Sequence, residues 1–162
     1  ADRPAAFAPR TVLVALDTTP AGEAVLPAAL ALAVAFAADL RLVVVVATLG
    51  TVGGDRAATA RLIPAATTAA LDLEAQTAAA YLTGLAERLR PAGVPIRAEV
   101  GRGDAAQVVT QLVAATAPSL LALATHGRSG FDALWTASVG SRMVGQAGGP
   151  LLLAHHAEPP RP

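Results

Sequence analysis

The sequence predicts an α/β fold in which helices cover both faces of an open, parallel, five-stranded sheet. Two observations support this prediction. Short apolar runs rich in Val and Leu recur along the chain, and segments with helical patterning separate them. The longest runs are continuous rather than alternating, which is typical of strands buried on both faces. Because a helix joins each strand to the next, we expect parallel strands and right-handed crossovers.

The length and composition favour a single domain. The 162 residues can bury a sizeable core, and because only 3% are aromatic that core must consist of Ala, Val and Leu. We expect the domain to span residues 11–156. Residues 1–10, rich in Pro and Ala, are expected to form a flexible arm, and 157–162 a tail.

The first strand and helix are expected at residues 11–17 and 18–37. The run TVLVALD is apolar and β-branched until it ends in a carboxylate. Thr19 can cap the helix that follows, and Glu23 suits its first turn. Pro27 is expected to delay or kink the regular helix.

The next segment contains a strand, a loop and a long helix. A run of four valines predicts the strand at 40–48, whereas 49–64 is weakly patterned and is expected to be a loop. Residues 65–93 predict a helix that ends at Gly93. Its buried face is expected to hold Leu71, Ala75, Ala78, Leu82, Leu85 and Leu89.

The last part of the chain repeats the alternation. Asp104 is placed to cap a helix over 105–117, and a further helix is expected near 138–147. The three remaining strands are expected at 94–101, 119–125 and 149–156.

Charge and composition exclude several classes of protein. The formal net charge is zero, so nothing indicates a nucleic-acid surface. The absence of cysteine excludes disulfides and thiol chemistry. The longest apolar run, 24–38, contains Pro27 and is shorter than the roughly 20 residues that a membrane span needs. The N-terminus lacks the residue order of a signal peptide. We therefore expect a cytoplasmic protein with neither membrane nor nucleic-acid partners.

Ligands of parallel α/β sheets bind at the carboxyl ends of the strands, where the strand order reverses. That rule selects Asp17, the end of the valine run at 43–46, and residues 125–130. The Asp17 carboxylate could accept hydrogen bonds from an adenine amino group or a ribose hydroxyl, or it could simply cap the following helix.

A glycine-containing turn at Gly127 and Gly130 follows the fourth strand. Backbone N–H groups in such a turn can approach phosphates, and the helix that begins at Ser138 would add a favourable dipole. An ordinary strand-to-helix loop with a plain N-cap is the alternative interpretation.

The chain resembles the universal stress protein family from Thr11 to His155. The resemblance is carried by VLVALDTTPAGEAVLPAALALA, LRLVVVVAT, VGRGDAAQVV, LLALATHGRSGFDALWTASV and GGPLLLAH. It implies a Rossmann-like sheet with strand order 3-2-1-4-5. It also implies ATP binding with a magnesium-type ion and a homodimer formed through the C-terminal strand.

The nucleotide motif of that family, G-2x-G-9x-G-[S/T], fits this chain in two registers. Starting at Gly127, it runs through Gly130 to 140–141 without a mismatch. Only the register that starts at Ala124 keeps the family's distance to the last strand. That register retains Gly127 but ends at 137–138 (Ala-Ser), so alanine replaces glycine twice. An added methyl group is costly where φ is positive or where phosphate lies against the backbone.

The resemblance implies a set of nucleotide-binding residues at the matching positions. Adenosine contacts are expected from Ala15, Asp17, Val45 and Leu123. Ribose and phosphate contacts are expected from Ala124, Gly127, Ala137, Ser138 and Val139. Arg128 could reach a phosphate or remain in solvent, and Val45 alone could equally be sheet core.

The leading functional hypothesis is an ATP-binding stress-response module. The alternatives are a family member that binds no ATP and acts through dimerisation and protein contacts, and a slow ATP hydrolase. No nucleophile triad, acid–base pair or metal cluster is apparent in the sequence, and a P-loop is impossible because the chain has no lysine. Catalysis is therefore expected to be slow at most.

Overall fold

The computed structural model describes residues 7–117, 119–126 and 149–156. These residues form one parallel sheet of five strands in the order β3-β2-β1-β4-β5. The predicted fold class and the strand order implied by the family resemblance are confirmed. The strands are β1 (Thr11–Leu16), β2 (Asp39–Val46), β3 (Ile96–Arg102), β4 (Ser119–His126) and β5 (Leu151–His156).

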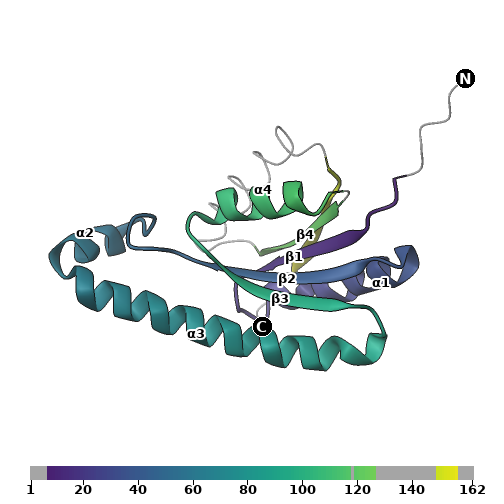
Figure 1. Cartoon of the computed structure of the whole chain (residues 1–162), viewed down its shortest axis with the longest axis horizontal. Helices are drawn as coiled ribbons and strands as arrows, with labels where there is room; N and C mark the ends of the chain where they lie inside the picture. Colours follow the sequence, from purple (N-terminus) through teal and green to yellow (C-terminus); the bar gives the residue numbers. More distant parts are fainter. Residues whose placement is uncertain (1–6, 118, 127–148, 157–162) are drawn as a thin grey trace, which may run out of the picture.

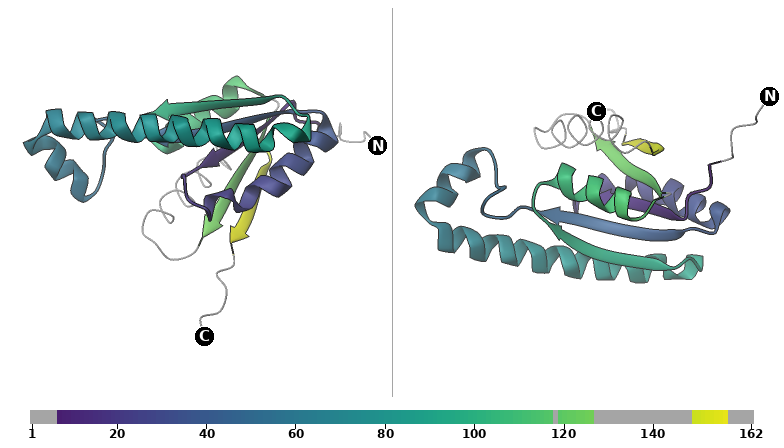
Figure 2. Two further views of the ribbon diagram at one scale, coloured as in Figure 1. Left: turned by 90° about the horizontal axis from the view of Figure 1, so that it is seen from below. Right: turned by 45° about the horizontal axis from the view of Figure 1, so that its top comes forward.

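Helices cover both faces of this sheet. Figure 1 shows α4 on one face and α1 and α3 on the other, and Figure 2 shows the same arrangement from two further sides. The α-helices are α1 (Leu26–Phe36), α2 (Asp55–Leu62), α3 (Pro64–Leu89) and α4 (Ala105–Ala115). Two short 3-10 helices, η1 (Gly22–Val25) and η2 (Arg90–Ala92), precede α1 and follow α3.

The sheet separates two apolar clusters because successive strand residues point to opposite faces. Val12, Val14 and Leu16 of β1 pack with α1 and α3. Leu13 and Ala15 of the same strand pack with α4. Both sides of β1 are therefore buried, which explains its continuous apolar sequence.

Helix α1 begins later than the sequence predicted. Glu23 and Ala24 donate backbone hydrogen bonds to Pro20 and Ala21 in turns of the 3-10 type, and the α-helix starts only at Leu26. Pro27 explains the delay, because its ring lacks an N–H and would clash with the carbonyl four residues earlier in a longer helix.

The expected loop at 49–64 contains a helix, α2, so that prediction was wrong over Asp55–Leu62. Only Ala60 of α2 is buried, and Leu62 is 82% exposed. Figures 1 and 2 show α2 and the start of α3 projecting past the end of the sheet. Because α2 buries so few of its side chains against the rest of the protein, its sequence has only a weak amphipathic pattern.

Two local predictions are confirmed. The predicted face of α3 is buried at Leu71, Ala78, Leu82 and Leu85, with Ala75 and Leu89 partly buried against the same cluster. Asp104 caps α4, since its Oδ1 accepts a hydrogen bond from the Gln107 N–H at 2.9 Å.

The α-helical part of α3 ends at Leu89, earlier than the expected end at Gly93. Gly93 follows η2 and takes a left-handed conformation.

Some predictions fall outside the described residues: the helix near 138–147, most of the arm at 1–10 and the tail at 157–162. Within the part of the chain that the structure describes, no helix is both long and apolar enough to cross a membrane.

We predict that Leu82→Ala lowers the free energy of unfolding by about 2–5 kcal/mol, because Leu82 is only 1% exposed and its removal leaves a cavity. Leu73→Ala is the matched control on the same helix. Leu73 is 63% exposed, so its loss should change stability by less than about 0.5 kcal/mol. Urea denaturation measures both, and equal losses would contradict the assigned buried face of α3.

Candidate functional site

The carboxyl end of β1 is the topological switch point of the sheet. From β1 the chain builds β2 and β3 on one side, and it later adds β4 and β5 on the other. Helices on opposite faces diverge beside such a strand and leave a crevice where ligands of open α/β folds bind. Asp17 is the first residue after β1 and therefore lies at this point.

Three of the residues implicated by the family resemblance meet on the α4 face of the sheet. Ala15 and Leu123 are direct neighbours in the β1–β4 register, and both are buried. Val45 is partly buried against the same cluster. Together they form an apolar wall near the carboxyl ends of β2, β1 and β4. The Ala124 side chain packs instead in the cluster on the α1–α3 face, so a contact from Ala124 on the α4 side would use its backbone.

Asp17 is held in a tight turn. Its Oδ1 accepts hydrogen bonds from the Thr19 N–H at 3.0 Å and from the Thr19 hydroxyl at 2.7 Å. Thr18 between them has a φ of 67°. This left-handed conformation is strained for a β-branched residue and is maintained only where its surroundings over-determine it. The turn thus fixes the carboxylate immediately beyond the buried strand.

Gly22 allows this turn to close. A Cβ atom at residue 22 would overlap Asp17 Oδ1 and would lie 3.5 Å from Thr19 Oγ1. The Gly22 N–H donates to the same Thr19 oxygen at 3.1 Å. Thr19 precedes the N-cap positions of η1 and α1, which are Ala21 and Val25, so its predicted role as helix cap was wrong and its hydroxyl instead closes the turn.

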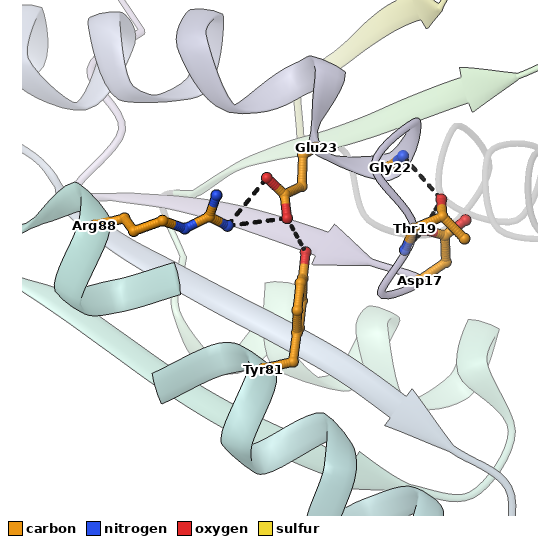
Figure 3. A network of polar contacts seen from close by, with 6 residues as sticks. All are labelled: Asp17, Thr19, Gly22, Glu23, Tyr81 and Arg88. Carbon is orange, nitrogen blue, oxygen red and sulfur yellow. Dashed lines mark hydrogen bonds and ion pairs between the residues drawn. The ribbon is translucent and has the colours of Figure 1, made fainter. Parts of the chain in front are cut away.

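The adjacent residue, Glu23, binds α3 (Figure 3). Its Oε1 accepts hydrogen bonds from the Tyr81 hydroxyl and from Arg88 Nη2, each at 3.0 Å, and Arg88 Nη2 also lies 3.1 Å from Oε2. Burial raises the pKa of Tyr81 above its ordinary value, and the hydrogen bond to Glu23 and the negative charges of Glu23 and Asp17 raise it further. The positive charge of Arg88 lowers this pKa, but by less than the other causes raise it. Tyr81 therefore stays a neutral donor at physiological pH.

Sequence reasoning found Glu23 as a residue of the first helical turn but missed Tyr81 and Arg88. These two residues are seven positions apart on α3 and so share one helical face. That spacing was a usable signal, but it did not reveal which acidic residue faces the pair.

The remaining residues implied by the resemblance, Gly127, Arg128, Ala137, Ser138 and Val139, lie outside the described residues. Over residues 7–117, 119–126 and 149–156, no group of His, Asp and Glu side chains could hold a metal ion.

A hollow of about 440 Å³ lies where the loop after β2 meets α2 and the start of α3. It is lined by Leu49, Gly50, Val52, Ala57, Ala60, Arg61 and Pro64. None of these residues belongs to the apolar wall or to the Asp17 turn.

The sheet order and the position of the site define an open, parallel α/β domain with its candidate crevice at the end of β1. The chain belongs to the universal stress protein family, whose family model matches residues 9–155. No curated protein matches the chain.

Solved structures of the same family share the fold. Universal stress protein UspA from Lactobacillus plantarum is 16% identical with a TM-score of 0.70, covering 89% of this chain and 96% of its own. A universal stress protein solved in complex with cAMP is 18% identical with a TM-score of 0.62, covering 93% of this chain and 99% of its own. A family protein from Burkholderia pseudomallei is 24% identical with a TM-score of 0.58, covering 93% of this chain and 98% of its own.

We predict that Gly22→Ala destabilises the protein by about 1–3 kcal/mol, because the new methyl group cannot coexist with Asp17 Oδ1 at its present position. Gly84→Ala is the matched control. Gly84 lies within α3, and a methyl group added there would meet nothing within 4 Å, so alanine should stabilise the helix by about 0.5–1 kcal/mol. Chemical denaturation of both variants tests the prediction, which a neutral Gly22→Ala would contradict.

Proposed function

We propose that this protein is an adenine-nucleotide-binding module whose ligand is ATP. The observation that carries the proposal is the position of Asp17, a carboxylate fixed directly after β1 at the switch point of the sheet. The apolar wall of Ala15, Val45 and Leu123 lies near the same ends of the strands. Apolar side chains near a fixed hydrogen-bond acceptor suit a purine base attached to a ribose.

The chemistry of this arrangement fits adenosine. Val45, the partly exposed member of the wall, would contact one face of the base, and the carboxylate would accept a hydrogen bond from the adenine amino group or a ribose hydroxyl. A carboxylate offers about four acceptor positions on its two oxygens. Thr19 uses two hydrogen bonds, both to Oδ1. These two bonds hold the carboxylate directly after β1.

Phosphate binding is assigned from the sequence alone. In the register that starts at Ala124, Gly127, Ala137, Ser138 and Val139 would supply backbone N–H groups and a hydroxyl to the phosphates. We propose that any Mg²⁺ arrives with ATP and is held chiefly by the phosphate oxygens, as is usual for this ion. The relative solved with cAMP supports the proposal, since cAMP shares adenine, ribose and phosphate with ATP.

Calorimetric titration of ATP with magnesium into nucleotide-free protein tests the proposal. We expect micromolar affinity, weakened about 10- to 100-fold by Asp17→Ala, because a hydrogen bond to a charged group contributes about 1.5–3 kcal/mol. Asp72→Ala is the control, since Asp72 is an exposed carboxylate of α3 that pairs with Arg102 of β3. No binding at millimolar ATP, or equal losses in both variants, would contradict the proposal.

The same titration separates the two motif registers. Loss of binding in Gly127→Val together with unchanged binding in Gly140→Val supports the register that starts at Ala124. Loss of binding in both variants supports the later register, because that register uses Gly127 as well as Gly140. Phosphate release that disappears in Asp17→Ala would instead support the third hypothesis, a slow ATP hydrolase.

A second candidate function is dimerisation without nucleotide. Among the described strands β5 pairs only with β4, and its Leu153 is 49% exposed. An exposed apolar edge is a liability unless another strand covers it, and pairing across a two-fold axis would do so. Alanine at 124 and 137, in place of motif glycines, also favours this candidate.

We predict a dimeric mass by light scattering at micromolar concentration and a monomer for Leu153→Arg, which places a charge on this edge. Leu73→Arg, at an exposed position on α3, is the control and should remain dimeric. A monomeric parent chain would contradict the dimer. A dimer that binds no ATP would make dimerisation the better account of function.

A further inference from the structure

Two polar clusters meet at a single peptide bond beside the candidate site. One joins Asp17, Thr19 and Gly22, and the other joins Glu23, Tyr81 and Arg88 (Figure 3). Gly22 and Glu23 are adjacent in the chain, so the two clusters form one continuous path. That path runs from the side chains of α3 to the carboxylate proposed to hold the nucleotide.

The half of this path near the site leaves little room for movement. The Thr19 hydroxyl donates to Asp17 at 2.7 Å and accepts from the Gly22 N–H at 3.1 Å, so one side chain links both ends of the turn. A Cβ atom added at Gly22 would overlap Asp17 Oδ1. A displacement of residue 22 must therefore disturb Thr19 or Asp17.

The half of the path near α3 is anchored in the fold. Tyr81 and the Glu23 side chain are both partly buried, and Tyr81 packs against the core cluster on the α1–α3 face. Arg88 adds a charge-assisted bond to both Glu23 oxygens, and such bonds are stronger than neutral ones. Since α3 packs through Leu71, Ala78, Leu82 and Leu85, its position fixes that of Glu23.

We propose that Tyr81 and Arg88 are positioning residues for the nucleotide site: acting through Glu23, they fix the turn that presents Asp17. The inference rests on the proposed nucleotide binding. It predicts that a change on α3, which touches no nucleotide, alters nucleotide affinity. The competing account is that these residues only attach α3 to the start of α1 and contribute stability alone.

Amide hydrogen exchange of the nucleotide-free protein separates the two accounts. The Thr19 and Gly22 amides bond to side chains of the turn and so report its opening directly. In Tyr81→Phe, which removes only the hydroxyl, we expect these two amides to exchange about fivefold faster. Amides of the buried strands β1 and β2 should be unchanged. Faster exchange in the strands with no change at Thr19 and Gly22 would overturn the inference.

ATP affinity is the second readout. Tyr81→Phe and Arg88→Gln should each weaken ATP binding about fivefold, with Arg88→Lys recovering part of the loss. Arg90→Gln is the matched control, because Arg90 pairs with Glu87 within the same stretch of chain and contacts neither Glu23 nor the turn. If the effect passes through Asp17, the double variant Asp17→Ala/Tyr81→Phe should bind no more weakly than Asp17→Ala.

The outcomes distinguish this inference from the function on which it rests. If the parent chain binds no ATP, the proposed function and the affinity effect both fail, and exchange at Thr19 and Gly22 still decides whether α3 positions the turn. If the parent binds ATP and Tyr81→Phe changes neither affinity nor exchange, the inference fails while the proposed function stands.

Discussion

The burial of β1 on both faces determines where this chain can place a polar ligand. From Val12 to Leu16 the strand is almost completely inaccessible, with α1 and α3 on one side and α4 on the other. A polar side chain within it would carry a desolvation cost with no partner to offset it. The first position that can hold a carboxylate is therefore the residue after the strand. Asp17 occupies it, at the point where the strand order also reverses.

Fixing that carboxylate determines much of the surrounding local structure. Asp17 is held by both polar groups of Thr19, which places Thr18 in a left-handed conformation and requires glycine at position 22. Such strain is usually maintained at sites where the geometry matters for function. Glu23, directly after Gly22, attaches the segment that follows the turn to α3 through Tyr81 and Arg88. Site and scaffold are thus connected through a short run of residues, 17–23.

The sequence predicted features that depend on local pattern and missed those that depend on long-range contact. The strand at β1, the buried face of α3 and the Asp104 cap were predictable because neighbouring residues determine each of them. Ala15, Val45 and Leu123 were grouped through the family resemblance, and the structure places all three in one cluster. The contacts of Glu23 were not, because Tyr81 and Arg88 lie 58 and 65 positions away. Helix α2 was missed because it buries almost nothing and so carries little amphipathic pattern.

The most direct test of the central claim, that adenine nucleotide binds at the end of β1, is a map of backbone amide chemical shifts during ATP titration. We predict saturable shifts concentrated at residues 15–19, 45–48 and 123–126. Along α3, only the amides near Tyr81 and Arg88 should shift. Shifts centred on the hollow beside α2, around Val52 and Arg61, would place the ligand elsewhere. An absence of shifts at millimolar ATP would contradict nucleotide binding itself.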